Sequence, residues 1–130
     1  HPDRIAKKSV IERQAAMQRS VDINRAYETL KYPLSRAQYL LSLQGIAVGT
    51  EQGGVQPSPE ILMESMAWRE RIADAPELKP LAEELEKVIA KSIALIAGHY
   101  KKAAWDLMAQ ETLRLGYFMK ANEELRRRKS

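Results

Sequence analysis

The 130-residue sequence has no cysteine, no long apolar run and only a small excess of positive charge. Without cysteine there can be no disulfide, thiolate metal site or cysteine nucleophile. Lys and Arg number 21 against 17 Asp and Glu, and the net charge of +4 excludes a histone-like polycation. No apolar run approaches the roughly 20 residues of a membrane helix. We therefore expect a soluble, cytosol-like protein of one domain or two small ones.

Glycine and proline gather in one place, because residues 45–59 hold four of the six glycines and two of the six prolines. This stretch predicts a linker over residues 47–58, between segments 1–46 and 59–130. Both segments space their apolar residues as helices do, and no alternating run typical of strands occurs. The sequence therefore predicts an all-α protein, with a helix hairpin followed by a three-helix bundle.

The first segment contains signals for two helices. A capping box at residues 9–12 predicts the start of the first one. Steps of four and three residues then form a one-sided stripe on it: Ala16, Ser20, Ile23, Tyr27 and Leu30. Pro33 can open the second helix, and Gly45 suits its C-cap. We expect the two helices to turn back on each other at Pro33.

Three helices are predicted in the second segment. The first has Ser58 as its N-cap and Pro59 as its first helical residue, and it ends near Asp74. The second begins near Pro80 and the third covers about 103–127, with a weakly signalled break at 98–102 between them. Their predicted core-facing residues are Ile61, Trp68, Ile72 and Ala75, then Leu81, Leu85, Val88, Ser92 and Leu95, then Ala104, Met108, Leu115, Phe118, Ala121 and Leu125.

The helix after Ser58 has a second face that is apolar at one end and acidic at the other. This face comprises Leu62, Met63, Met66, Glu70 and Asp74. Exposed apolar patches bordered by charge often mark partner sites, and methionine suits an adaptable surface. A broad apolar arc with Leu62 and Met66 in the core explains the same spacing, and spacing alone favours that interpretation.

Several motifs occur together along the chain. Residues 1–3 read HPD, and the proline favours a loop that presents an imidazole and a carboxylate. Alone, this tripeptide is better explained by a chance match or a tag remnant. Residues 23–30 then read INRAYETL, and 33–45 read PLSRAQYLLSLQG. With LME at 62–64 and AAWD at 103–106, the chain resembles the HscB family of J-domain co-chaperones.

This resemblance implies a function in iron–sulfur cluster assembly. Family members bring a scaffold protein of the IscU type to an ATP-dependent heat-shock chaperone of the HscA type and stimulate its ATPase. The implied chaperone-binding residues are His1, Pro2, Asp3 and Arg4, where Arg4 keeps the charge of the lysine usual in the family. The family's J-domain has two helices before HPD, so we expect the complete protein to have an upstream helix pair.

The resemblance also implies that the C-terminal bundle binds the scaffold. The implied residues are Leu62, Met63, Met66, Glu70 and Asp74, with an aromatic residue of the last helix. Tyr117 or Phe118 can supply this aromatic group, and Tyr117 is favoured because it lies off the inward stripe. Ala67 stands where the family can have Glu, so one polar contact is expected to be missing.

No enzyme site is found, because Gly-rich phosphate loops and nucleophile elbows are absent and His99 has no plausible metal partner. We expect no cofactor, no metal, no membrane, and a monomer in the cytoplasm, or in the mitochondrial matrix of a eukaryote. Two alternatives stay open. A helical nucleic-acid-binding protein would use residues 7–8 and the basic tail 126–129, although a solvated terminus explains that tail better. A generic helical adaptor would bind through the Leu62 face.

Overall fold

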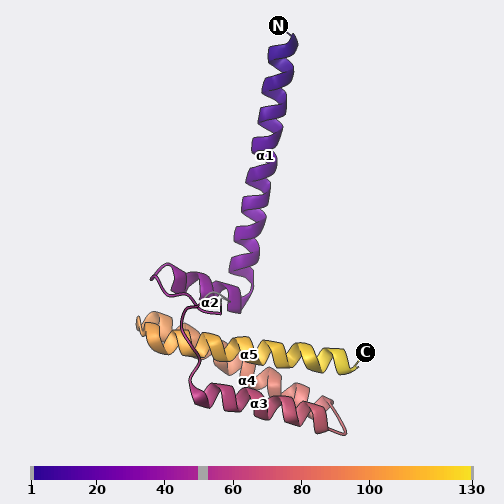
Figure 1. Ribbon diagram of the computed structural model, residues 1–130, viewed down its shortest axis with the longest axis vertical. Coiled ribbons are helices and arrows are strands. Elements are labelled where there is room, and N and C mark those ends of the chain that lie inside the picture. Colours follow the sequence, from indigo (N-terminus) through magenta and orange to yellow (C-terminus); the bar gives the residue numbers. More distant parts are fainter. Residues whose placement is uncertain (1, 50–52, 130) are drawn as a thin grey trace. The chain divides into compact units, whose positions relative to one another are not determined.

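The computed structural model describes residues 2–49 and 53–129, and these form five helices (Figure 1). The helices are α1 (Pro2–Lys31), α2 (Pro33–Ser42), α3 (Pro59–Asp74), α4 (Lys79–Lys101) and α5 (Trp105–Lys129). The only β-type pairing in these ranges is an isolated parallel bridge between Val48 and Val55. The prediction of an all-α protein is therefore confirmed. No helix within the described residues has both the length and the apolar content needed to cross a bilayer.

The chain forms two compact units, one up to Arg36 and the other from Ala37 onward. This division falls inside α2, whereas the sequence predicted a boundary at residues 47–58. Ala37, Leu41 and Val48 are all buried. Residues 37–49 therefore contribute to the core of the second unit instead of joining the first.

The first unit consists of α1 and the first turn of α2. The expected loop is wrong at residues 2–3, and so is the helix start at Ser9, because α1 already begins at Pro2. Proline is tolerated in the first helical turn, where its missing N–H has no intrahelical acceptor to lose. The stripe on α1 is exposed, with 68% of Ile23 and 60% of Tyr27 accessible. The packing expected of a hairpin is therefore absent along this stripe of described residues.

The end of α2 agrees with the prediction made from Gly45. The N–H of Gly45 donates to the carbonyl of Ser42 at 2.9 Å, and that of Ile46 donates to the carbonyl of Leu41 at 3.0 Å. This hydrogen-bond pair is a Schellman motif, which needs a left-handed residue directly after the helix. Gly45 has a φ of +76° and adopts it without the steric penalty of a Cβ.

The second unit is built around the predicted three-helix bundle, in which α5 packs against both α3 and α4 (Figure 1). The central cluster consists of buried residues that the sequence placed inward: Trp68, Ile72, Leu81, Leu85, Phe118, Ala121 and Leu125. Four of the predicted core-facing residues are only half-buried, namely Ala75, Val88, Leu95 and Ala104, and Ile96 is buried beside Leu95. Ile96 lies four residues after buried Ser92 and so continues its face of the helix.

Candidate partner-binding surface

The outer face of α3 leaves large apolar side chains uncovered. The exposed fractions are 42% for Leu62, 69% for Met63 and 60% for Met66. Glu70 and Asp74 are exposed further along the same helix. These five residues, named here the α3 surface, therefore lie outside the core. The alternative that Leu62 and Met66 are core residues is wrong.

The opposite face of α3 supplies the reason for this exposure. Ile61, Trp68 and Ile72 are buried and repeat at helical spacing, so they form the face by which α3 packs on the bundle. One face of a helix can be turned to the core at a time, and the residues between these positions must point outward. The bundle therefore presents the α3 surface on a helix that is already fixed from behind.

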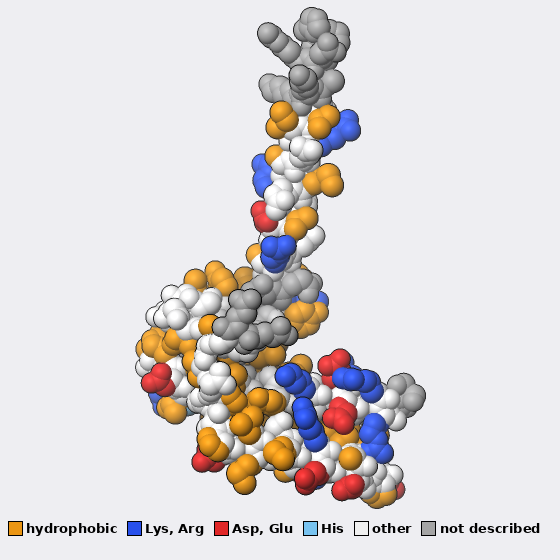
Figure 2. All heavy atoms as spheres, viewed as in Figure 1, with side chains coloured by type: hydrophobic (Ala, Val, Ile, Leu, Met, Phe, Trp, Pro, Cys, Tyr) orange, Lys and Arg blue, Asp and Glu red, His pale blue; other side chains and the backbone are white. Residues whose placement is uncertain are grey.

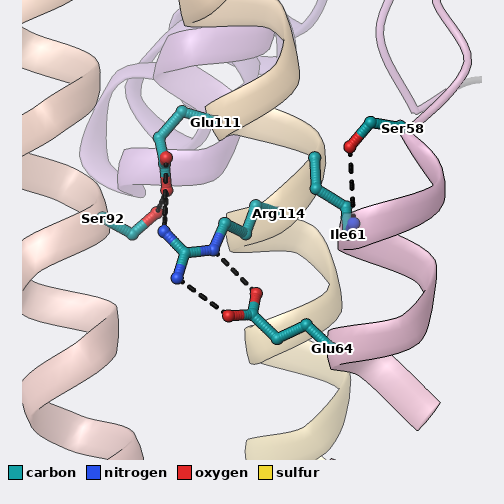
Figure 3. Close-up of polar contacts among 6 residues, drawn as sticks. All are labelled: Ser58, Ile61, Glu64, Ser92, Glu111 and Arg114. Carbon is teal, nitrogen blue, oxygen red and sulfur yellow. Dashed lines mark hydrogen bonds and ion pairs between the residues drawn. The ribbon is translucent and has the colours of Figure 1, made fainter. Parts of the chain in front are cut away.

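The beginning of α3 is attached to α5 through one side chain. Gln110 accepts a hydrogen bond from the N–H of Ser58 at 2.9 Å and donates one to the carbonyl of Gln56 at 2.8 Å. The Ser58 hydroxyl accepts a hydrogen bond from the N–H of Ile61 at 3.4 Å, as its predicted N-cap role requires (Figure 3). Leu62 and Met63 thus follow a first helical turn whose position is set by α5.

A polar network holds the middle of α3. Arg114 donates two hydrogen bonds to the carboxylate of Glu64, at 2.7 and 2.9 Å, and also pairs with Glu111 at 3.3 Å (Figure 3). Glu111 in turn accepts a hydrogen bond of 2.6 Å from buried Ser92 of α4. The hydrogen bonds to Glu64 raise the pKa of Arg114 further above its ordinary value, so the guanidinium stays charged. The network links all three helices.

The aromatic residue beside the α3 surface is Tyr117. Phe118 is only 2% exposed and belongs to the central cluster, with the Arg114 guanidinium over its ring at 5.0 Å. Tyr117 is half-buried and lines a cleft together with Ser65 and Arg69 of α3. Of the two aromatic candidates, only Tyr117 is therefore available to a partner.

The structure describes the implied chaperone-binding residues only in part. His1 lies outside the described residues. The structure places the backbone of Pro2, Asp3 and Arg4 in the first turn of α1, and their side chains also lie outside what it describes. Among the described residues, no group of His, Cys, Asp or Glu side chains could hold a metal ion.

Two basic residues beside the α3 surface, Arg69 and Lys120, were not predicted from the sequence. Arg69 lies three residues after Met66 and is exposed, and Lys120 lies three residues after Tyr117. Residues three apart on a helix are neighbours, so this spacing was a signal available in the sequence. Arg69 and Lys120 line the same cleft because α3 packs against α5. This packing joins residues that are far apart in the sequence, so the sequence alone does not reveal it.

The geometry defines a class: a helical bundle with a large apolar face left uncovered on one of its helices. Residues 57–126 match the family described as the HSCB C-terminal oligomerisation domain. The co-chaperone protein HscB homolog of Burkholderia thailandensis is 46% identical over 83 residues, which cover 64% of this chain and 47% of that protein. The co-chaperone protein HscB of Proteus mirabilis is 35% identical over 132 residues, covering 96% of this chain and 76% of that protein.

Solved structures give the same result. Chaperone HscB from Vibrio cholerae matches 99% of this chain and 78% of its own, with a TM-score of 0.78 and 32% identity. The Jac1 co-chaperone from Saccharomyces cerevisiae shares the fold, with a TM-score of 0.74 and 22% identity over 91% of this chain and 82% of its own. This chain belongs to the HscB family, as its motifs indicated, and its match spans about half the length of the Burkholderia relative.

Proposed function

We propose that this protein is a co-chaperone of iron–sulfur cluster assembly that delivers an IscU-type scaffold protein to an HscA-type chaperone and stimulates the ATPase of that chaperone. Membership of the HscB family supports this proposal, and the relatives from Burkholderia and Proteus are named co-chaperones. The chain also has the HPD tripeptide at residues 1–3. The scaffold and the chaperone would therefore contact different parts of one protein.

The observation that carries the proposal is the exposure of Leu62, Met63 and Met66 on a helix whose other face is already buried. Covering apolar surface gains about 25 cal/mol for each Å² removed from water. Methionine side chains adapt their shape to the surface that they meet. Glu70 and Asp74, at the other end, would attract basic side chains of the scaffold and fix its orientation.

Delivery would follow from binding two partners at once. The HPD segment would bind one conformation of the chaperone better than another and so favour the conformation that hydrolyses ATP. The α3 surface would keep the scaffold nearby, which raises its effective concentration at the chaperone's peptide site. The protein has no cysteine, so the cluster would remain on the scaffold as cargo. The protein itself would act as an adaptor and not as an enzyme.

The scaffold-binding part is tested by Met66→Asp. Placing a charge in the apolar strip should weaken binding of purified IscU-type scaffold at least tenfold by calorimetry, while circular dichroism shows unchanged helicity. The matched control is Met119→Asp, because Met119 is an exposed methionine of α5 outside the α3 surface. Equal affinity of Met66→Asp and wild-type protein would show that the scaffold binds elsewhere.

The chaperone-binding part is tested by His1→Gln in the full-length protein. The steady-state ATPase of the HscA-type chaperone, measured with scaffold present, should lose its stimulation. Binding of scaffold to the same variant should be unchanged, because His1 is not part of the α3 surface. An ATPase that responds equally to His1→Gln and wild-type protein would instead fit a generic helical adaptor.

A further inference from the structure

A polar cleft of about 370 Å³ lies along the outer edge of the contact between α3 and α5, beside the α3 surface. Ser65 and Arg69 line it from α3, and Tyr117 and Lys120 line it from α5. Figure 2 shows hydrophobic side chains gathered over the first part of α3, and Lys and Arg side chains with some acidic ones over the later part of α5. The apolar strip therefore borders a region rich in charge.

Three cations line this cleft, and two of them, Arg69 and Lys120, have no acidic partner among the described residues. Arg69 is exposed and makes no hydrogen bond or ion pair within residues 2–49 and 53–129. Lys120 likewise has no ion pair in those ranges, and its ammonium lies over the Tyr117 ring, 5.3 Å from the centroid. Arg71, the other arginine of this part of α3, is by contrast paired with Glu84. An arginine and a lysine thus face the cleft with their hydrogen-bond donors available.

The acidic side chains of the cleft lie further along α5. Glu123 and Glu124 follow Tyr117 and Lys120 by three to seven residues, which places them roughly 5–10 Å along the helix axis. Glu123 pairs with Arg127 at 3.8 Å, so one carboxylate is balanced locally. The end of the cleft nearest Met66 is therefore its positive end.

We propose that the positive end of this cleft receives an acidic side chain of the protein that docks on the α3 surface. The inference rests on the proposed function, since it names a second contact with the same partner. Arg69 lies three residues after Met66 and seven after Leu62, so all three lie along one side of α3. A guanidinium can bind a carboxylate through two parallel hydrogen bonds, and Lys120 adds a second positive charge from the other wall.

This contact would determine which way round the partner binds. Its apolar residues would cover Leu62 and Met66, an acidic residue would enter the cleft at Arg69, and basic residues would face Glu70 and Asp74. A partner rotated end for end would bring like charges together at both places, and this repulsion would disfavour that orientation. The apolar strip would supply affinity, and the charges on its two sides would supply orientation.

The test is the affinity of purified IscU-type scaffold for Arg69→Glu and Lys120→Glu, measured by calorimetry. Charge reversal at Arg69 should weaken binding about tenfold, and Arg69→Ala should weaken it less. The control is Lys91→Glu, which makes the same change of net charge on α4, outside the cleft, and should bind as wild type does. The acidic surface residues of the scaffold are then replaced by Lys one at a time. One of these replacements should restore binding to the Arg69→Glu variant and to no other variant.

The outcomes separate this inference from the proposed function. If Arg69→Glu and Lys120→Glu bind normally while Met66→Asp does not, the cleft contact is refuted and scaffold binding at the α3 surface stands. If no Lys replacement in the scaffold restores binding to Arg69→Glu, the arginine does not meet a carboxylate and the inference fails. Normal binding by all three variants would refute both.

Discussion

Arg114 of α5 and Glu64 of α3 form an ion pair with two hydrogen bonds, between side chains fifty residues apart. Glu64 lies directly between Met63, which belongs to the α3 surface, and Ser65, which lines the cleft. Holding Glu64 therefore sets the rotation of α3 about its own axis. The pair thus helps to determine which side chains of α3 face outward.

We expect Arg114→Ala to lower the free energy of unfolding by about 1–2 kcal/mol, because it removes charged hydrogen bonds and leaves Glu111 without its cation. The pair is about one-third exposed, so solvent screening keeps the loss at the lower end for charged hydrogen bonds. Urea unfolding followed by circular dichroism measures it. Arg69→Ala is the control, since Arg69 has no such pair among the described residues. Equal stability of the two variants would contradict this assignment.

The parts of the fold that local chemistry determines were predictable from sequence. Ser58, the proline after it and the spacing of Ile61, Trp68 and Ile72 define α3 and its buried face, and the structure has them as expected. The exposure of Leu62 and Met66 was less certain, because spacing alone also fits a wide apolar arc. Whether these two side chains are exposed depends on how many helices surround α3, and that number is a property of the tertiary packing.

The parts that sequence did not predict have different physical origins. The start of α1 at Pro2 depends on how readily proline is accepted in a first turn, and a capping box seven residues later gave a competing signal. The Arg114–Glu64 pair joins residues with no local relation. The break between α4 and α5 was only weakly signalled, because its left-handed position is held by Ala103 and not by a glycine.

Ala103→Gly should stabilise the protein by about 0.5–1 kcal/mol. Ala103 has a φ of +54°, and the N–H groups of Ala103 and Ala104 donate to the carbonyls of Tyr100 and His99 in a Schellman motif. A left-handed alanine costs roughly 1–2 kcal/mol, and the greater freedom of glycine in the unfolded chain offsets only part of that gain. The midpoint of urea unfolding measures the change. Ala104→Gly is the matched control and should give no gain, and a loss of stability in Ala103→Gly would contradict the argument.

Tyr117→Ala and Phe118→Ala should affect different properties. Phe118 is buried against the central cluster, so its truncation should lower the free energy of unfolding by about 3–5 kcal/mol. Tyr117 borders the cleft, so its truncation should cost less than about 1.5 kcal/mol but weaken scaffold binding several-fold. Thermal unfolding and calorimetric titration together measure both effects. If Phe118→Ala remained stable and lost binding instead, the two roles would be reversed.

Stability should depend on pH through Glu84 of α4, which accepts two hydrogen bonds from Arg71 of α3, at 2.6 and 3.1 Å. These hydrogen bonds lower the pKa of the Glu84 carboxyl below its ordinary value. A lowered folded-state pKa means that the pair stabilises the fold fully above the unfolded pKa of about 4.3 and loses this effect as pH falls through the lowered value. Both side chains are exposed, so we expect the contribution to be small.

The measurement compares urea midpoints of wild-type protein and Glu84→Gln between pH 7 and pH 2. Wild-type protein should be the more stable at pH 7, and the difference should vanish once the Glu84 carboxyl is protonated, because both side chains are then neutral acceptors beside Arg71. Glu83→Gln is the control, since Glu83 is an exposed neighbour with no ion pair among the described residues, and its difference from wild type should stay flat. A difference for Glu84→Gln that persists unchanged to pH 2 would show that the carboxylate's charge does not stabilise the contact between α3 and α4.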